Sequence, residues 1–241
     1  DRSFNIITAD EGILGTAEFY INPSDSRSWS GSGSTLANIT SYSNSASTTN
    51  LSLNNGTVAT ASNITYIQHN SSGTAPSATI GNISGNLTNY TIALFLKVSN
   101  TNSNTDHGIF MYGNKTQNQS IGGNIYSGGT NQIAHYNYSN DTTFNQSASY
   151  NWLNWNFYVF RKVSGTKQLW LNNTQITSTA TAANNATSLP SNSTFDYGGR
   201  NAPGEYDNWN TQLGFCGIWS SAISESEMTF LYNKFKGDYG L

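Results

Sequence analysis

Apolar residues that recur at every second position are the sequence feature that most constrains this fold. In residues 90–98 the even positions are apolar, whereas the odd positions include Thr91 and Lys97. This period of two is that of a half-buried β-strand, whose successive side chains point to opposite faces of a sheet. Residues 154–163 and 167–172 alternate in the same way, and a short glycine-containing turn joins them, which predicts a hairpin.

Similar runs occur along the whole chain, and one of them lacks the alternation of apolar and polar residues. Residues 212–220 carry apolar or small side chains at both sets of positions, so we expect this strand to be covered on both faces. Shorter strands are predicted at 57–61, 64–68, 108–112, 123–126 and 132–138. Repeated short strands separated by turn residues indicate an all-β fold, either a sandwich or a barrel.

One helix is predicted, close to the C-terminus. Ser224 and Glu227 have the Ser-x-x-Glu spacing of a capping box, in which each side chain bonds to a backbone amide at the start of the helix. The residues that follow give this helix one apolar face, made of Met228, Leu231 and Phe235. The pattern predicts a helix over 224–236 that lies against the β structure.

Neutral polar residues take the place of charge in this chain. Asn, Ser and Thr fill 95 of the 241 positions, and charged residues make up 10%, against about a quarter in an ordinary domain. Ten Lys and Arg against thirteen Asp and Glu, with no cluster of either sign, argue against a nucleic-acid groove. No apolar run approaches the ~20 residues of a membrane-spanning helix. The single Cys216 excludes a disulfide framework and a cysteine-based zinc site. We expect one domain over residues 1–241, with residues 1–12 as a possible N-terminal arm.

Asn-x-Ser/Thr triplets are more frequent than the composition predicts. If Ser and Thr fell at random, their 61 positions would complete such a triplet after about nine of the 34 asparagines, yet there are 16. The asparagines are Asn38, Asn50, Asn55, Asn63, Asn70, Asn82, Asn86, Asn89, Asn114, Asn118, Asn137, Asn140, Asn145, Asn172, Asn185 and Asn192. The excess predicts covalent N-linked glycans and therefore an extracellular or virion-surface location.

Four segments follow one another in an informative order. They are residues 89–97 (Asn-Tyr-Thr-Ile-Ala-Leu-Phe-Leu-Lys), the tryptophan-containing hairpin 152–173, Phe-Asp-Tyr-Gly-Gly at 195–199, and the strand, turn and capped helix of 213–232. In this order they resemble the concanavalin A-like lectin/glucanase superfamily, and within it the laminin-G-like (LamG-like) domains. The Gly/Ser-rich segment 26–35 is similar to a turn of LamG-like domains in phage and virus surface proteins. The resemblance covers most of residues 13–237, except 40–88, and implies a two-sheet antiparallel jelly roll.

Some members of this superfamily are glucanases, so a pair of carboxylates in this chain could form a glycosidase site. A retaining glycosidase needs two carboxyl groups about 5–5.5 Å apart. Glu205 and Asp207 have a suitable spacing, but they follow Pro203-Gly204 in a predicted loop and lack a third acid. Three histidines, His69, His107 and His135, lie in polar stretches without a nucleophile motif. We therefore expect no enzymatic activity.

The loop that contains these two acids is the predicted sugar-binding segment. Aromatic rings there can stack on pyranose rings, and carboxylate and amide groups can bind hydroxyls; the residues are Tyr206, Asp207, Asn208, Trp209 and Asn210. Against this reading, a loop tryptophan in a sandwich more often closes the end of the core, and the same alternative applies to Trp29, a second loop tryptophan. Calcium is common in LamG-like domains, and Asp106 and Asp207 are the predicted carboxylate ligands.

These patterns predict a non-enzymatic, glycosylated virion surface protein (a spike, fibre or capsid decoration) that binds host surface glycans. Its other expected partners are further virion or surface-assembly subunits, and we expect a homo-oligomer. The alternative is an archaeal-type extracellular filament or cell-surface subunit that assembles by strand exchange, with the apolar residues of 2–19 as the donor strand. A lesser alternative is a secreted polysaccharide hydrolase.

Overall fold

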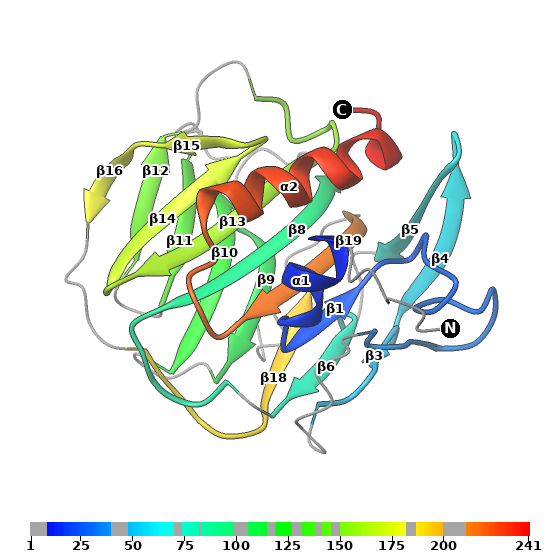
Figure 1. Cartoon of the computed structure of the whole chain (residues 1–241), viewed down its shortest axis with the longest axis horizontal. Helices are drawn as coiled ribbons and strands as arrows, with labels where there is room; N and C mark the ends of the chain where they lie inside the picture. The colour runs from blue at the N-terminus through cyan, green and yellow to red at the C-terminus, as the bar shows by residue number, and fades with distance from the viewer. Residues whose placement is uncertain are drawn as a thin grey trace, which may run out of the picture.

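The computed structural model shows two antiparallel β-sheets packed face to face, as the sequence predicts. It describes residues 9–39, 48–69, 74–81, 83–98, 106–114, 119–126, 132–137, 141–145, 150–181, 187–199 and 211–241. Their arrangement is a jelly-roll sandwich with helices on one outer face (Figure 1). Within these residues no helix is both long enough and apolar enough to cross a membrane.

Eight strands form the first sheet. In spatial order they are β15 (Thr174–Ile176), β14 (Thr166–Leu171), β13 (Asn156–Val163), β8 (Tyr90–Val98), β19 (Thr211–Trp219), β5 (Ile64–His69) and β4 (Gly56–Ala61), with β1 (Phe19–Ile21) also paired to β19. β19 pairs with β5 through its first residues and with β1 through its last ones. The β4–β5 hairpin therefore projects from the end of the sheet, at the right of Figure 1.

Nine strands form the second sheet. Their spatial order is β16 (Ser178–Thr181), β12 (Thr142–Asn145), β11 (Gln132–Tyr136), β10 (Ser120–Tyr126), β9 (Asp106–Gly113), β18 (Ser193–Tyr197), β6 (Ser77–Ile80), β3 (Leu51–Ser52) and β2 (Thr35–Leu36). A separate short pair joins β7 (Gly85–Leu87) to β17 (Thr187–Leu189). Because β15 and β16 are separated by Thr177 alone, the chain passes from one sheet to the other at this side of the sandwich.

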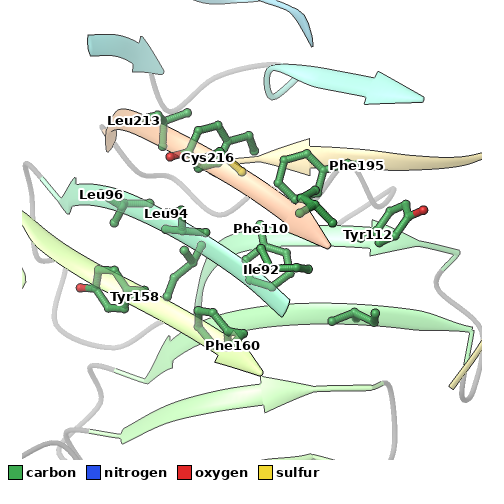
Figure 2. Packing of buried hydrophobic residues seen from close by; sticks show 14 of the residues in the cluster. Ile92, Leu94, Leu96, Phe110, Tyr112, Tyr158, Phe160, Phe195, Leu213 and Cys216 are labelled. Atoms are coloured by element: carbon green, nitrogen blue, oxygen red, sulfur yellow. The ribbon is translucent and has the colours of Figure 1, made fainter. Parts of the chain in front are cut away.

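Buried side chains form two clusters, one on each side of the first sheet. Between the sheets, Phe110 packs edge-to-face on Phe160 with ring centroids 5.1 Å apart, and Tyr112 and Phe195 continue the same layer (Figure 2). The second cluster lies between the first sheet and the helices, where Phe215 stacks on Phe235 at 4.6 Å. Burial of a large apolar side chain stabilises the fold by about 1.5–3 kcal/mol, so the aromatic residues compensate for the scarcity of charge pairs.

The C-terminal helix α2 (Glu225–Phe235) confirms the capping prediction. The Ser224 side chain accepts a hydrogen bond from the Glu227 amide, and the Glu227 carboxylate accepts one from the Ser224 amide. A short 3₁₀ helix (Lys236–Tyr239) follows. Its Tyr239 hydroxyl accepts a 2.7 Å hydrogen bond from the Phe215 amide, which fixes this end of the chain to the sheet.

Two expectations need correction because helices cover the outer face of the first sheet. β8 is buried on both faces, and Thr91 is fully buried rather than exposed. Its hydroxyl donates to the Ser221 carbonyl at 2.9 Å and accepts from the Ile223 amide at 3.1 Å. Residues 9–15 of the predicted arm and donor strand form a helix, α1 (Ala9–Gly15), which buries Ile13 and Leu14 in the chain's own second cluster. Residues 1–8 lie outside the described part.

Candidate functional site

The sites that the sequence predicts cannot be assembled from the described residues. Tyr206, Asp207, Asn208, Trp209 and Asn210 lie outside them, as does Glu205. Asp106 is the first residue of β9, and its side chain is also outside the described part. The described residues contain no group of three or more His, Cys, Asp or Glu side chains that could hold a metal ion. The sugar-binding and calcium assignments therefore stay predictions.

A different site is formed by the loop that follows β1, residues 22–34. Its first turn is closed by Asn22, whose side-chain oxygen accepts a 3.0 Å hydrogen bond from the Ser24 amide. The Asp25 carbonyl accepts from the amides of Ser28 and Trp29, both at 2.9 Å. Ser28 and Ala37 then close the base of the loop, since the Ala37 amide donates to the Ser28 carbonyl at 2.7 Å. These bonds hold the backbone that carries Trp29 in one conformation.

The β4–β5 hairpin forms the opposite wall of the site. Its two turn residues, Ser62 and Asn63, have φ values of 52° and 64°, which is the pattern of a type I′ turn between antiparallel strands. Thr60 and Thr65 are cross-strand partners, and their hydroxyl oxygens are 3.1 Å apart. The Ser24 hydroxyl donates to the Thr65 carbonyl at 3.4 Å, which joins the loop to the hairpin.

An open groove of about 540 Å³ lies between this loop and the hairpin. We call it the Trp29 groove; it is lined by Pro23, Ser24, Ser26, Trp29, Ser30, Gly31, Val58, Ala59, Thr60 and Thr65. The indole of Trp29 is half-buried and packs on the same core cluster as Val58. A second hollow of about 590 Å³ adjoins the groove and shares Ser24, Ser26 and Thr65 with it. Asn22, Asp25, Asn63 and Asp238 also line this second hollow.

The charges of the site are largely paired. The Arg27 guanidinium binds the Asp25 carboxylate, with Nη2 to Oδ2 at 2.6 Å and Nε to the two oxygens at 3.1 and 3.2 Å. These hydrogen bonds lower the pKa of Asp25 and keep it ionised. Behind the loop, burial and then the Asp25 charge raise the pKa of Tyr20 to about 12. The described lining of the Trp29 groove itself consists of hydroxyl side chains, one glycine, one indole and the apolar side chains of Pro23, Val58 and Ala59, and it includes no charged residue.

The lining of the Trp29 groove offers neutral hydrogen-bonding groups and one indole face. Hydroxyl and amide groups exchange hydrogen bonds with sugar hydroxyls, and an indole face packs on the apolar face of a pyranose ring. A general acid must be protonated when it acts, whereas Asp25 is held ionised by Arg27. Sequence reasoning named Trp29 without locating a site, because the hairpin wall comes from a part of the chain for which the resemblance gave no strand register. The sequence signal that could have indicated the site is a tryptophan within the serine-rich residues 22–34.

A second group of ionisable side chains lies inside the sandwich at the β13–β14 turn. Lys162 and Lys167 are cross-strand partners and are buried, Lys162 completely. His135, also fully buried, bonds through Nε2 to the Tyr90 hydroxyl at 2.8 Å. Burial lowers the pKa of all three bases, and that of Lys167 falls to about 8, although Asp141 acts in the opposite direction. Each of these bases is therefore easier to keep neutral than in water.

The structure separates the triplet asparagines by exposure. The exposed ones are Asn50, Asn55, Asn63, Asn89, Asn114, Asn145 and Asn192, while Asn38 and Asn172 are partly buried. Asn137 is fully buried, so we do not expect an attached glycan on the folded chain there, and the glycosylation assignments stay predictions. Asn172 has a structural role, since its side chain accepts from the Phe157 amide and donates to Asn156, both at 2.8 Å. The side chains of Asn70, Asn82, Asn86, Asn118, Asn140 and Asn185 are outside the described part.

Comparison with known proteins places the fold and leaves the family open. No family model matches the sequence, and no curated protein matches it. The binding domain of Paraclostridial Mosquitocidal Protein 1 has a TM-score of 0.64 and 15% identity over 92% of this chain and 53% of that one. The botulinum neurotoxin serotype D ligand-binding domain, in complex with N-acetylneuraminic acid, has a TM-score of 0.65 and 15% identity over 93% and 52%.

A sialidase is also similar in structure. Trypanosoma rangeli sialidase, in complex with 2,3-difluorosialic acid, has a TM-score of 0.60 and 10% identity over 89% of this chain and 32% of that one. Our chain thus spans about half of the toxin domains and a third of the sialidase. Such identities show a shared β-sandwich fold alone, and the LamG-like assignment stays a resemblance.

Proposed function

We propose that this chain is a non-enzymatic glycan-binding domain of an extracellular protein, and that the Trp29 groove holds the sugar. The observation that carries the proposal is a half-buried indole on a hydrogen-bonded loop, which lines an open groove together with Val58, Ala59, Thr60 and Thr65 of the hairpin. A groove of about 540 Å³ falls within the usual range of small-ligand sites, about 300–1,000 Å³. The toxin domain in complex with N-acetylneuraminic acid supports the proposal by analogy of fold.

The proposal is tested by binding to an array of neutral and sialylated oligosaccharides, followed by titration calorimetry with the best ligand. We expect Trp29→Ala to weaken binding roughly 30-fold, because loss of a central aromatic contact costs about 2 kcal/mol. Trp152→Ala is the matched control: Trp152 is also a partly buried loop tryptophan of the same core cluster, outside the groove lining. No binding to any glycan, or equal losses in both variants, would contradict the proposal.

We further propose that this domain is part of the surface of a virion. The excess of Asn-x-Ser/Thr triplets and the resemblance of residues 26–35 to a turn of phage and virus surface proteins support this reading. The cellular-filament alternative is weakened because Ile13 and Leu14 of its donor strand are held in the chain's own core. Glycopeptide mapping tests the location: we expect occupied sites among the exposed asparagines, such as Asn55 and Asn114, and none at Asn137. An intact mass of 26.1 kDa for native protein would remove the glycosylation support.

A further inference from the structure

Asn63 is a triplet asparagine that also lines the second hollow. It is the acceptor residue of Asn63-Ile64-Thr65, lies in the turn of the β4–β5 hairpin and is exposed. Its φ of 64° is in the left-handed region, which asparagine adopts more readily than most residues. Because Asn63 lines the hollow that adjoins the Trp29 groove, a glycan attached to it would begin next to the proposed sugar site.

The other exposed triplet asparagines of the described part line neither hollow. They are Asn50, Asn55, Asn89, Asn114, Asn145 and Asn192. A glycan on one of these residues begins outside both the second hollow and the Trp29 groove. Among the described and exposed positions, Asn63 is therefore the one from which an attached glycan enters the groove region directly.

The second hollow offers hydrogen-bonding partners to a sugar. Asp25 and Asp238 line it with carboxylates, and Asn22 lines it with a side-chain amide. Sugar hydroxyls donate to carboxylate oxygens, and such hydrogen bonds are stronger than those between neutral groups. The volume of about 590 Å³ is within the usual range of small-ligand sites. A glycan that begins at Asn63 can therefore be held in the hollow rather than extend into solvent.

The second hollow and the Trp29 groove are contiguous. They share Ser24, Ser26 and Thr65. The Ser24 hydroxyl donates to the Thr65 carbonyl at 3.4 Å, so the loop and the hairpin are joined where the two hollows meet. Hydroxyl side chains thus lie between the start of the glycan at Asn63 and the indole of Trp29.

We propose that an N-linked glycan on Asn63 occupies the second hollow, reaches the Trp29 groove and competes there with glycans of other molecules. This inference rests on the proposed function, because the same indole would pack on a sugar ring of the chain's own glycan. A short tether gives the attached glycan an effective concentration of about 1 mM. A groove that binds this sugar with a Kd of about 1 mM is then about half occupied by it. Modification of Asn63 would thereby regulate attachment to other glycans.

The test compares the chain made in eukaryotic secretory cells, which attach N-linked glycans, with the chain made in bacteria that do not. Glycopeptide mapping should show a glycan on Asn63 of the secreted chain, and an unmodified Asn63 contradicts the proposal. Asn63→Gln removes the acceptor and keeps an amide in the hollow. Asn114→Gln is the matched control, since Asn114 is an exposed triplet asparagine outside both linings.

A soluble gadolinium chelate, which broadens the signals of accessible N–H groups, measures coverage of the Trp29 indole. In the secreted chain and in Asn114→Gln, we expect about half the broadening of the Trp29 signal that secreted Asn63→Gln shows. The signal of Trp152, which is outside both linings, should be alike in all three. The bacterial chain and bacterial Asn63→Gln should not differ. Equal broadening of the Trp29 signal in the three secreted proteins, or the same difference in the bacterial pair, overturns the proposal.

A titration separates this inference from the proposed function. The probe is N,N′-diacetylchitobiose, the disaccharide with which such glycans begin, and it should bind secreted Asn63→Gln about twofold more tightly than the secreted chain. Equal affinity for both leaves the proposed function in place and overturns this inference. A Trp29 signal that neither this probe nor any array glycan shifts in Asn63→Gln contradicts the proposed function itself.

Discussion

Two hairpins of the first sheet have similar turns, but one is buried and the other is exposed. The β13–β14 hairpin turns at Ser164 and Gly165, and the β4–β5 hairpin turns at Ser62 and Asn63, all four with positive φ. The first five residues of β13 are buried, whereas on β4 only Gly56 is. The local chemistry of a turn therefore specifies a hairpin, and the position of that hairpin in the sheet decides its burial.

The difference separates a region that maintains the fold from one that is free to bind. β13–β14 is enclosed so fully that it keeps two lysines inside the sandwich. β4–β5 instead presents uncharged side chains and a strand edge to the surroundings. Changes in the first hairpin should alter stability, and changes in the second should alter binding or association.

The largest loss of stability is expected from a substitution that creates a cavity at β13. Phe160 is fully buried and contacts Phe110 and His135 with ring centroids 5.1 and 5.4 Å away. Phe160→Ala should lower the free energy of unfolding by about 3–5 kcal/mol, because it removes buried surface and leaves a void. Urea unfolding followed by circular dichroism measures the change. A loss below about 1 kcal/mol would show that this region is less tightly packed than described.

Acid should destabilise the enclosed hairpin through His135. Its pKa in the folded state lies well below 6.5, owing first to burial and then to Lys167 and Lys162. Between these two pKa values His135 binds a proton in the unfolded chain but not in the folded chain. The free energy of unfolding therefore decreases as pH falls below about 6.5. Each such histidine contributes up to about 1.4 kcal/mol per pH unit, and the buried His69 acts in the same direction.

Unfolding at pH 7, 6 and 5 with His135→Gln isolates this contribution. Glutamine keeps a hydrogen-bonding group near the Tyr90 hydroxyl without the titration. The dependence of stability on pH should therefore be shallower than in the unmodified chain, by about one proton. Lys162 and Lys167, whose charges act on the histidine, remain in both proteins, as does Asp141, which acts on Lys167. Identical slopes would mean that His135 titrates normally.

A smaller effect is expected at the helix that covers the first sheet. Glu227→Ala removes the Glu227 carboxylate that accepts from the Ser224 amide, at 2.6 Å, and should cost about 1 kcal/mol. Glu225→Ala is the control, since Glu225 is in the same first turn without a role in the capping box. Thermal unfolding compares them, and equal melting temperatures would count against the capping box as a source of stability.

The smallest effect on stability should be at the projecting hairpin. Thr60 is exposed, and its described side-chain contact is the one with Thr65. Thr60→Ala should change the free energy of unfolding by at most about 0.5 kcal/mol. A loss comparable to that of Phe160→Ala in the same urea assay would remove the distinction between the two hairpins.

Strong local patterns were predictable, and burial was less so. The β13–β14 hairpin, β19 and the α2 capping box were found from spacing alone, because alternation and capping depend on neighbouring residues. Burial of Thr91 was missed because the segment that contacts its hydroxyl, residues 221–223, is about 130 residues away along the chain. α1 was missed for want of a clear helical pattern, and the Trp29 groove because its two walls are more than 25 residues apart in sequence.

The most direct test of sugar binding in the Trp29 groove is the indole N–H spectrum of the protein during titration with a glycan. The six tryptophan signals are assigned by single substitutions to phenylalanine. We predict that the Trp29 signal shifts in proportion to bound ligand. The Trp219 signal should stay in place, because this indole is buried and its Nε1 donates to the Ile13 carbonyl at 2.9 Å. Saturable binding that leaves the Trp29 signal unmoved would contradict the account.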